Sequence, residues 1–156
     1  MSQFNEVLKK IPLPVTVVTV GRGGVENGLT VSWTCPVSFD PLQLMIGIDS
    51  KHYSVEFLDS TKNFVINVLA KGQEKVAARF ARQSFNDGEK LEGIATKESQ
   101  TGGAILTDAV CYYDCEVIAK HTQGDHYVYV GKVVAAEILN DVEPMSTQNG
   151  MRYTKK

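Results

Sequence analysis

The sequence predicts a mainly β fold, a small antiparallel β-barrel with short helices that cap it. Runs of β-branched and aromatic residues recur at short spacing along the 156 residues, and turn residues separate them. The runs do not alternate with helices in the manner of βαβ units, which favours an antiparallel arrangement. Hydrophobic residues make up 43% of the chain, which is ordinary for a globular protein with its own core, so we expect a single domain over residues 1–156.

The N-terminal part predicts a helix followed by a hairpin. Apolar residues recur at helical spacing over residues 4–11, and Pro12 and Pro14 end the pattern, so we expect a short packed helix. Residues 15–20 form a β-branched run, and glycines and Asn27 lie between this run and the next strand, which predicts a β-hairpin. The glycine cluster joins two strands and opens no helix, so it lacks the context of a dinucleotide-binding loop.

The next segment carries most of the chemistry. We expect residues 29–37 to form one strand, in which the hydroxyls of Thr30, Ser32 and Thr34 share a face because side chains alternate along a strand. Buried hydroxyls need partners, so this face suggests a surface that meets a polar group. A turn at residues 39–41 leads into residues 42–48, whose apolar residues predict an interior strand covered on both faces.

Residues 49–54 form a cluster of hydrogen-bond donors that leads into a helical turn at residues 55–58. Ser54 is a plausible N-cap of that helix. Free backbone N–H groups, hydroxyls and Lys51 in one place suit an anion, most simply a phosphate. A capped helix with solvated charges explains the same residues, and the residues alone leave both interpretations open.

The middle of the chain predicts a strand, a helix and a long connection. Residues 64–69 are an apolar strand that Asn67 interrupts, so its amide needs hydrogen-bonding partners. Residues 73–82 place apolar side chains on one helical face. Residues 84–103 are polar and glycine-bearing, and a connection of this length can cover a site.

The C-terminal part predicts a second hairpin. Residues 111–119 and 126–139 are long β-like runs, and residues 120–125 have turn chemistry. His126 lies at the start of the second run, and of the three histidines it is the best placed to contact a ligand. An ordinary hydrogen-bonded strand-end histidine is the alternative. After residue 142 we expect irregular chain.

Charge and cysteine content exclude several classes. A net charge of −2 gives no basic stripe, so we expect no binding to nucleic acid or to a membrane. The N-terminus lacks the order of a signal peptide, so we expect a cytoplasmic protein. Cys35, Cys111 and Cys115 form no metal-binding pair, and Cys111 and Cys115 lie about 13 Å apart within one strand, too far for a disulfide, so core thiols are expected. A redox role for Cys35 would need a neighbouring base.

Several separated motifs together resemble the flavin reductase-like family of FMN-binding split barrels. The matching pieces are PVTVVTV at residues 14–20, NGLTVSWTCPVSFDPLQLMIGI at 27–48, FVINVL at 64–69, the helix at 73–82 and GDHYVYVGKV at 124–133. They keep the family's order over nearly the whole chain. The resemblance implies a Greek-key-like split barrel, a homodimer, and an FMN (or FAD) in a groove at the dimer interface.

The resemblance also implies a residue-by-residue site. Residues expected to border the flavin ring system are Thr30, Ser32, Trp33, Thr34 and Cys35. Residues expected to surround the phosphate are Ser50, Lys51, His52, Tyr53 and Ser54. His126 would lie near the nicotinamide, as the one candidate catalytic residue, and Phe85 would close over the cofactor.

Two positions depart from the family pattern. Trp33 stands where a smaller or phenyl side chain is common and could restrict access to the flavin, and His52 stands where serine is common and could alter the phosphate contact.

Two functions are compatible with the resemblance. The first function is an NAD(P)H-dependent reductase that passes hydride to flavin and onward to free flavin, ferric complexes or a partner. The second is an FMN electron carrier that a redox protein partner reduces. In both, the cofactor supplies the chemistry, which agrees with the lack of a nucleophile–base constellation.

Overall fold

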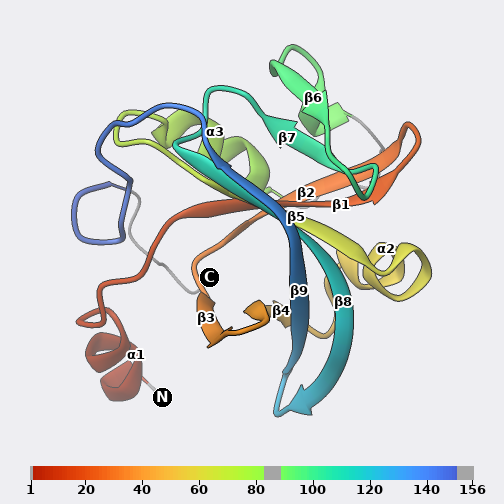
Figure 1. The fold of residues 1–156 in the computed structure, drawn as a ribbon. Coiled ribbons are helices and arrows are strands. Elements are labelled where there is room, and N and C mark those ends of the chain that lie inside the picture. Colours follow the sequence, from red (N-terminus) through yellow and green to blue (C-terminus); the bar gives the residue numbers. More distant parts are fainter. Residues whose placement is uncertain (1, 83–88, 151–156) are drawn as a thin grey trace.

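The computed structural model describes residues 2–82 and 89–150, and in it a seven-stranded antiparallel sheet dominates the molecule (Figure 1). The strands lie side by side in the order β2-β1-β5-β8-β9-β4-β3. Their bounds are Thr16–Arg22 (β1), Val25–Val31 (β2), Thr34–Phe39 (β3), Leu42–Asp49 (β4), Asn63–Val68 (β5), Cys111–Gln123 (β8) and His126–Ile138 (β9). A small second sheet pairs β6 (Thr96–Glu98) with β7 (Ala104–Leu106). The helices are α1 (Ser2–Leu8), α2 (Ser54–Thr61), α3 (Glu74–Ala81) and a 3-10 turn at Glu89–Leu91.

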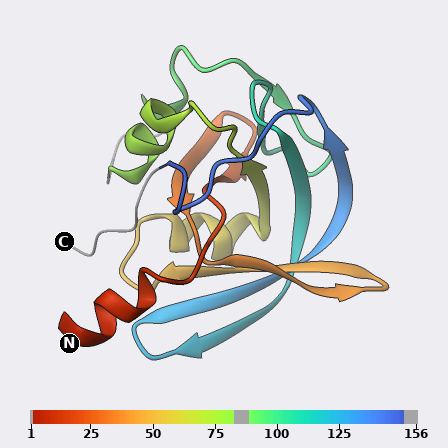
Figure 2. The ribbon, with the colours of Figure 1, turned by 90° about the vertical axis from the view of Figure 1, so that its left-hand side faces the viewer.

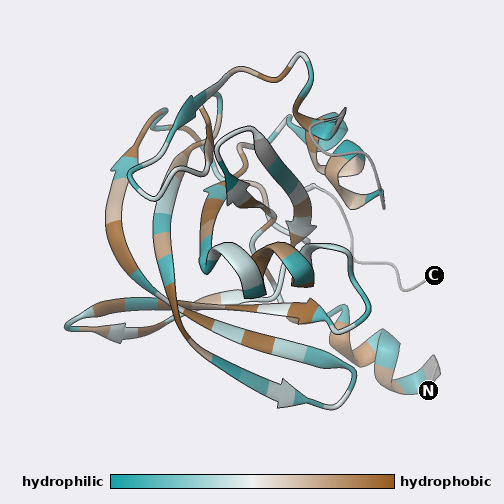
Figure 3. Cartoon of the chain, turned by 90° about the vertical axis from the view of Figure 1, so that its right-hand side faces the viewer, coloured by the Kyte–Doolittle hydropathy of each residue, from teal (hydrophilic) through white to brown (hydrophobic). Residues whose placement is uncertain are grey.

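The sheet curls into a barrel, as the sequence predicted (Figure 2). Leu29 and Val31 of β2 share one buried cluster with Leu44 and Ile46 of β4, although four strands separate β2 from β4 in the sheet order. Contact between strands so far apart in a sheet requires that the sheet close around a common core. Helix α2 adds Phe57 and other apolar side chains to the same cluster, so it fills one opening of the barrel. Hydrophobic and hydrophilic segments accordingly alternate along the long strands (Figure 3).

Both predicted hairpins are confirmed, and both extend further than the sequence indicated. Gly23 and Gly24 join β1 to β2 with φ of 66° and 85°, and two successive positive values match the twist of a tight hairpin. Strands β8 and β9 have 13 residues each and pair as far as Gln123 and His126. The turn is therefore confined to Gly124, with φ of 57°, and its neighbour Asp125. The predicted six-residue turn at 120–125 is wrong at its start, because polar residues 120–123 continue the strand on an exposed face.

The single strand expected at residues 29–37 is two strands. β2 ends at Val31 and pairs with β1, whereas β3 begins at Thr34 and pairs with β4 at the opposite edge of the sheet. Ser32 and Trp33 carry the chain between the two edges. Polar alternation continues through this link, so the sequence pattern did not reveal the break. The hydroxyls of residues 30, 32 and 34 consequently do not form one strand face.

Two expectations about burial also need correction. Strand β4 is buried on one face only, because Leu44, Ile46 and Ile48 are buried while the residues between them are partly exposed. Helix α1 ends at Leu8 and is not packed by its own chain, since Phe4 is 71% exposed. Its apolar face has no covering element among the described residues.

β5 and α3 agree with the sequence, whereas the 3-10 turn and the β6–β7 hairpin were not predicted, because residues 84–103 were expected to form a connection. β5 and α3 lie where they were predicted, and Ala77 and Phe80 are the buried residues of α3. The amide of Asn67 is satisfied, since it donates to Val17 O at 3.1 Å and accepts from the Leu106 N–H at 2.9 Å. Burial raises the pKa of the Cys115 thiol to about 12. Among the described residues, no helix has the length and apolar character that crossing a bilayer requires.

Candidate functional site

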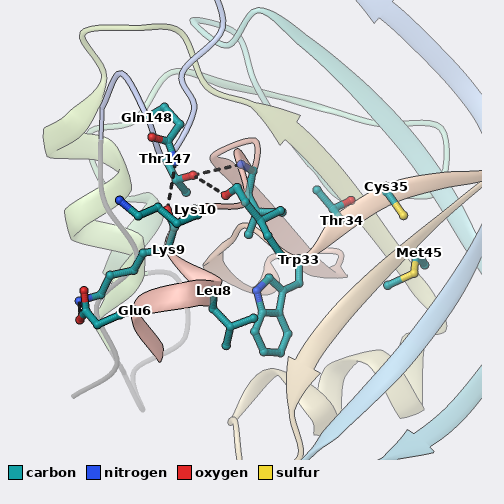
Figure 4. Close-up of a pocket in the computed structure, with 12 residues that line it drawn as sticks. Glu6, Leu8, Lys9, Lys10, Trp33, Thr34, Cys35, Met45, Thr147 and Gln148 are labelled. Carbon is teal, nitrogen blue, oxygen red and sulfur yellow. Dashed lines mark hydrogen bonds and ion pairs between the residues drawn. The ribbon is translucent and has the colours of Figure 1, made fainter. Parts of the chain in front are cut away.

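A pocket of about 580 Å³ lies between α1 and the start of β3 (Figure 4). Trp33, Thr34 and Cys35 form one wall together with Met45 of β4. The opposite wall comes from α1 and the chain after it, including Leu8. A pocket of this size, mostly apolar with a few polar groups, has the dimensions of a small-molecule site.

Thr34, which lines this pocket, has a hydroxyl that is unsatisfied within the fold. Its Oγ1 is buried and has no hydrogen-bond partner in the part of the chain that the structure describes. An unpaired buried hydroxyl costs about 1–3 kcal/mol, so such a group is normally satisfied by a bound molecule or water. The wall of the pocket thus combines the apolar side chains of Trp33 and Met45 with the polar side chain of Thr34.

Contacts between the two ends of the chain hold the wall beside α1 in place. The Leu13 N–H donates to Thr147 Oγ1 at 3.0 Å, and Gln148 Nε2 donates to Lys9 O at 3.1 Å. Lys9, Lys10 and Glu6 also line the pocket, so its rim on this side carries charges of both signs. Lys9 pairs with Glu6 at 2.6 Å, and this contact lowers the pKa of Glu6.

The structure brings His126 and Trp33 together. Their ring centroids are 4.6 Å apart at an interplanar angle of 36°. Gly47 of β4 lies under the indole, where a Cβ would be 3.3 Å from Trp33 Cβ. His126 Nδ1 lies 2.6 Å from a carboxylate oxygen of Asp125. The candidate catalytic histidine is therefore positioned by a tryptophan and an aspartate at the end of the β8–β9 hairpin.

The loop at residues 50–54 is anchored to the same hairpin, because the Ser50 N–H donates to Asp125 O at 2.9 Å. His52 Nδ1 accepts a hydrogen bond from the Ser54 N–H at 3.0 Å. Burial, and next the positive charge of Lys90, lower the pKa of His52, while Asp49 opposes them. His52 thus satisfies a backbone donor at the start of α2 with its neutral ring.

Ser54 does not have its predicted role as N-cap. It is the first residue of α2, it is fully buried, and its Oγ accepts a hydrogen bond from Asn27 Nδ2 at 3.2 Å. Tyr53 precedes the helix without a side-chain cap bond and packs edge-on against Phe57 at 5.5 Å. The N–H of Ser54, the first of the helix, donates instead to the His52 ring.

The other predicted site residues are dispersed. Thr30 Oγ1 donates to Ala77 O at 2.6 Å, so it joins β2 to α3. Ser32 is half-buried in the link between β2 and β3, and Lys51 is exposed. Phe85 lies outside the described residues. Sequence reasoning missed the residues that come from distant segments, namely Met45, Asn27 and the pocket wall around Thr147, because no local pattern marks them.

The buried contact between Ser54 and Asn27 supports a prediction about stability. Ser54→Ala should lower the free energy of unfolding by about 1–2 kcal/mol, because it leaves the buried Asn27 amide without this partner. Urea denaturation measures the change. Ser60→Ala on the exposed side of the same helix is the control and should change stability by less than about 0.5 kcal/mol. Equal effects of the two substitutions would contradict the prediction.

Comparisons with known proteins agree with this geometry. The family model described as "Flavin reductase like domain" matches residues 8–155. The chain is 32% identical to the NADH-dependent FMN reductase AsuE2 of Streptomyces nodosus subsp. asukaensis over 85% of this chain and 72% of that protein. It is 28% identical to a putative diflavin flavoprotein of Nostoc sp. over 95% of this chain, but it spans only 27% of that longer protein.

Among solved structures, the NADH:FAD oxidoreductase SgcE6 of Streptomyces globisporus C-1027 superposes with a TM-score of 0.87 at 27% identity. The match covers 93% of this chain and 87% of that one. This likeness confirms the predicted split-barrel fold, and the family model covers nearly the whole sequence. The chain belongs to the flavin reductase-like domain family.

Proposed function

We propose that this protein is a flavin reductase that binds FMN and accepts hydride from NADH or NADPH. The observation that carries the proposal is the pocket at the start of β3, where the unpaired hydroxyl of Thr34 lies in a wall shared with Trp33 and Met45. An isoalloxazine ring needs a flat apolar surface and a few hydrogen bonds at its edge, and these residues fit both needs. Bound flavin would supply the hydride acceptor.

The residues divide into two groups in this proposal. Trp33, Thr34 and Cys35 border the ring system, because they line the pocket together. The loop with Ser50, Lys51 and His52 holds the phosphate beside the first turn of α2, where the helix dipole favours an anion, while the N–H groups of Ser54 and Val55 already donate to His52. Thr30 and Ser54 have a structural role and do not contact the flavin, since their hydroxyls already form hydrogen bonds within the fold.

The test is anaerobic mixing of the purified protein with each flavin and each nicotinamide. We expect bleaching of flavin absorbance by NADH or NADPH when FMN is bound. AsuE2 is named for FMN and SgcE6 for FAD, so both flavins belong in the experiment. Free flavin, ferric complexes and a partner protein are then compared as electron acceptors. Absence of flavin binding would overturn the proposal.

His126 is proposed to position the nicotinamide rather than to exchange protons. His126→Ala should slow flavin reduction roughly tenfold or more while FMN affinity changes little, because its contact is made to the donor. Stopped-flow absorbance gives the rate, and fluorescence titration gives the affinity. His121→Ala, an exposed histidine on β8, is the control and should leave both unchanged. A parallel loss of FMN affinity in His126→Ala would place the histidine against the flavin instead.

A specific contact also favours a second function, that of an FMN electron carrier. Trp33 packs against the ring of His126, and if the flavin lies against Trp33, this ring pair would occupy space that a nicotinamide needs. In this case dithionite or a redox protein would reduce the flavin, and neither nicotinamide would do so at a useful rate. The anaerobic experiment separates the two functions.

We also propose that the protein is a homodimer. Large exposed apolar side chains lie at both ends of β3, which is an edge strand of the sheet. Phe4 and Val7 belong to α1, which borders the pocket near the start of β3, and Phe39 ends the strand. A second copy that covers this edge would bury these side chains and complete the open side of the pocket.

A further inference from the structure

A cluster of charged and aromatic side chains joins α2 to the β8–β9 hairpin. The carboxylate of Asp59 on α2 accepts a hydrogen bond from the Tyr129 hydroxyl at 2.9 Å. The same carboxylate accepts from Lys120 Nζ, at 3.1 Å to one oxygen and 2.9 Å to the other. Lys120 Nζ also lies 4.1 Å from the ring centroid of Tyr127 and 5.5 Å from that of Tyr129. Asp59 therefore binds both strands of the hairpin, which restrains the hairpin more than one surface ion pair would.

The hydroxyl of Tyr129 is the buried end of this cluster. Tyr129 is 1% exposed, and burial, followed by the bond to Asp59, raises its pKa, so the hydroxyl remains a donor. The side chain of Asp59 is 44% exposed, so water can reach its carboxylate. Loss of Asp59 therefore leaves a buried donor without this partner, which favours a shift of β9 relative to α2.

His126 lies between two attachment points that join β9 to the segment containing α2. At the first point, the Ser50 N–H donates to Asp125 O at 2.9 Å. At the second point, Tyr129 donates to Asp59. The ladders with β4 and β8 set the position of β9 within the sheet, whereas these two points set how this end of the sheet lies against α2. The first point is a backbone bond, but the second depends on side chains and can be removed by substitution.

We propose that Asp59 is a positioning residue for hydride transfer, which holds the end of the β8–β9 hairpin so that the His126 ring stays against Trp33. The inference rests on the proposed function, in which His126 contacts the nicotinamide. The rings of His126 and Trp33 have centroids 4.6 Å apart, so a small movement of the hairpin changes their contact. A purely stabilising role of Asp59 would change the free energy of unfolding but leave this contact unaltered in the folded protein.

The first readout is the fluorescence of Trp33, which is the only tryptophan in the chain. Its emission depends on the His126 ring against it, so His126→Ala defines the emission without that contact. In the full chain without flavin, we expect Asp59→Ala to move the emission intensity at least halfway from the wild-type value toward the His126→Ala value. Glu116→Ala, which removes an exposed carboxylate from β8, is the control and should keep the wild-type emission.

The second readout is the single-turnover rate of flavin reduction at saturating nicotinamide. Asp59→Ala should slow this rate about fivefold in the wild-type background but less than about twofold in the His126→Ala background, because Asp59 acts through His126. FMN affinity should stay within about threefold of the wild-type value in these variants. Two independent structural defects would instead slow the rate by the same factor in both backgrounds.

A second variant covers the case in which Asp59→Ala does not fold. The double variant Lys120→Met with Tyr129→Phe removes both partners of Asp59, keeps the aromatic ring in the core, and should change the emission in the same way. Wild-type emission in whichever variant folds, or equal slowing in the two backgrounds, overturns the inference and leaves the proposed function standing. If neither nicotinamide reduces flavin bound to the wild type, the proposed function fails, while the emission of Trp33 still decides whether Asp59 positions His126.

Discussion

Gly131→Val should destabilise the protein by about 3 kcal/mol or more, because Gly131 lies where β9 crosses the barrel core. A Cβ at this position would be 2.7 Å from Cys115 Cβ and 2.9 Å from Phe64 Cε1, and nearer still to Phe64 Cζ. Cys115 and Phe64 are both fully buried, so neither can move aside into solvent. Overpacking of a tight core typically costs about 1–3 kcal/mol for added methyl groups, and valine adds three carbon atoms here.

Urea denaturation of Gly131→Val measures this loss, and Ala136→Val on the same strand is the control. Ala136 is exposed, so its substitution should change stability by less than about 0.5 kcal/mol. A double-mutant cycle locates the clash: Phe64→Leu removes the ring atoms nearest Gly131, so the double variant Gly131→Ala with Phe64→Leu should be more stable than the two single losses predict. Strict additivity would show that the strain arises elsewhere.

The sequence predicted the hairpins well because their determinants are local. Two adjacent glycines with positive φ, or a Gly-Asp pair, between β-branched runs strongly favour a tight hairpin turn over other conformations. Asn67 was likewise recognised as a polar residue that needs partners, and the structure supplies them from β1 and from the β7 strand.

The break between β2 and β3 could not be predicted in this way. Ser32 and Trp33 continue the alternation of polar and apolar residues, so nothing local marks the place where the chain leaves one sheet edge for the other. The position of the break follows from closure of the barrel, which is a long-range property. Burial of α1 was mispredicted for a related reason, since an apolar helical face indicates that something covers it but not which chain does so.

The candidate site shows the same division. The predicted ring-binding residues 33–35 do meet in one pocket, because they are consecutive in the chain. Serine is a common N-cap residue, but the hydroxyl of Ser54 accepts a hydrogen bond from Asn27, because β2 lies against the start of α2. Lys90 lies in no recognised motif, and its buried ammonium contacts a strand and a helix that the sequence does not place near it.

The apolar edge at β3 leads to the prediction with the largest expected effect on assembly. Phe39 is 96% exposed at the end of this edge strand, and burying a phenylalanine is worth roughly 1.5–3 kcal/mol. A twofold-symmetric interface buries each such residue twice, so Phe39→Asp should weaken the dimer by roughly 3–6 kcal/mol, which is about a hundredfold to ten-thousandfold in its dissociation constant. Charge on an exposed edge strand further opposes pairing with a second edge.

Sedimentation velocity at micromolar concentration should show dimers for the wild type and monomers for Phe39→Asp. Flavin affinity should also fall at least tenfold in the variant, because the pocket loses the wall that the second copy would provide. Ile138→Asp is the matched control, since Ile138 is 67% exposed at the end of β9, outside the β3 edge. It should leave both the dimer and the flavin affinity unchanged. A wild-type monomer that binds flavin tightly would contradict the shared site, and a dimer that survives Phe39→Asp with unaltered affinity would move the interface away from β3.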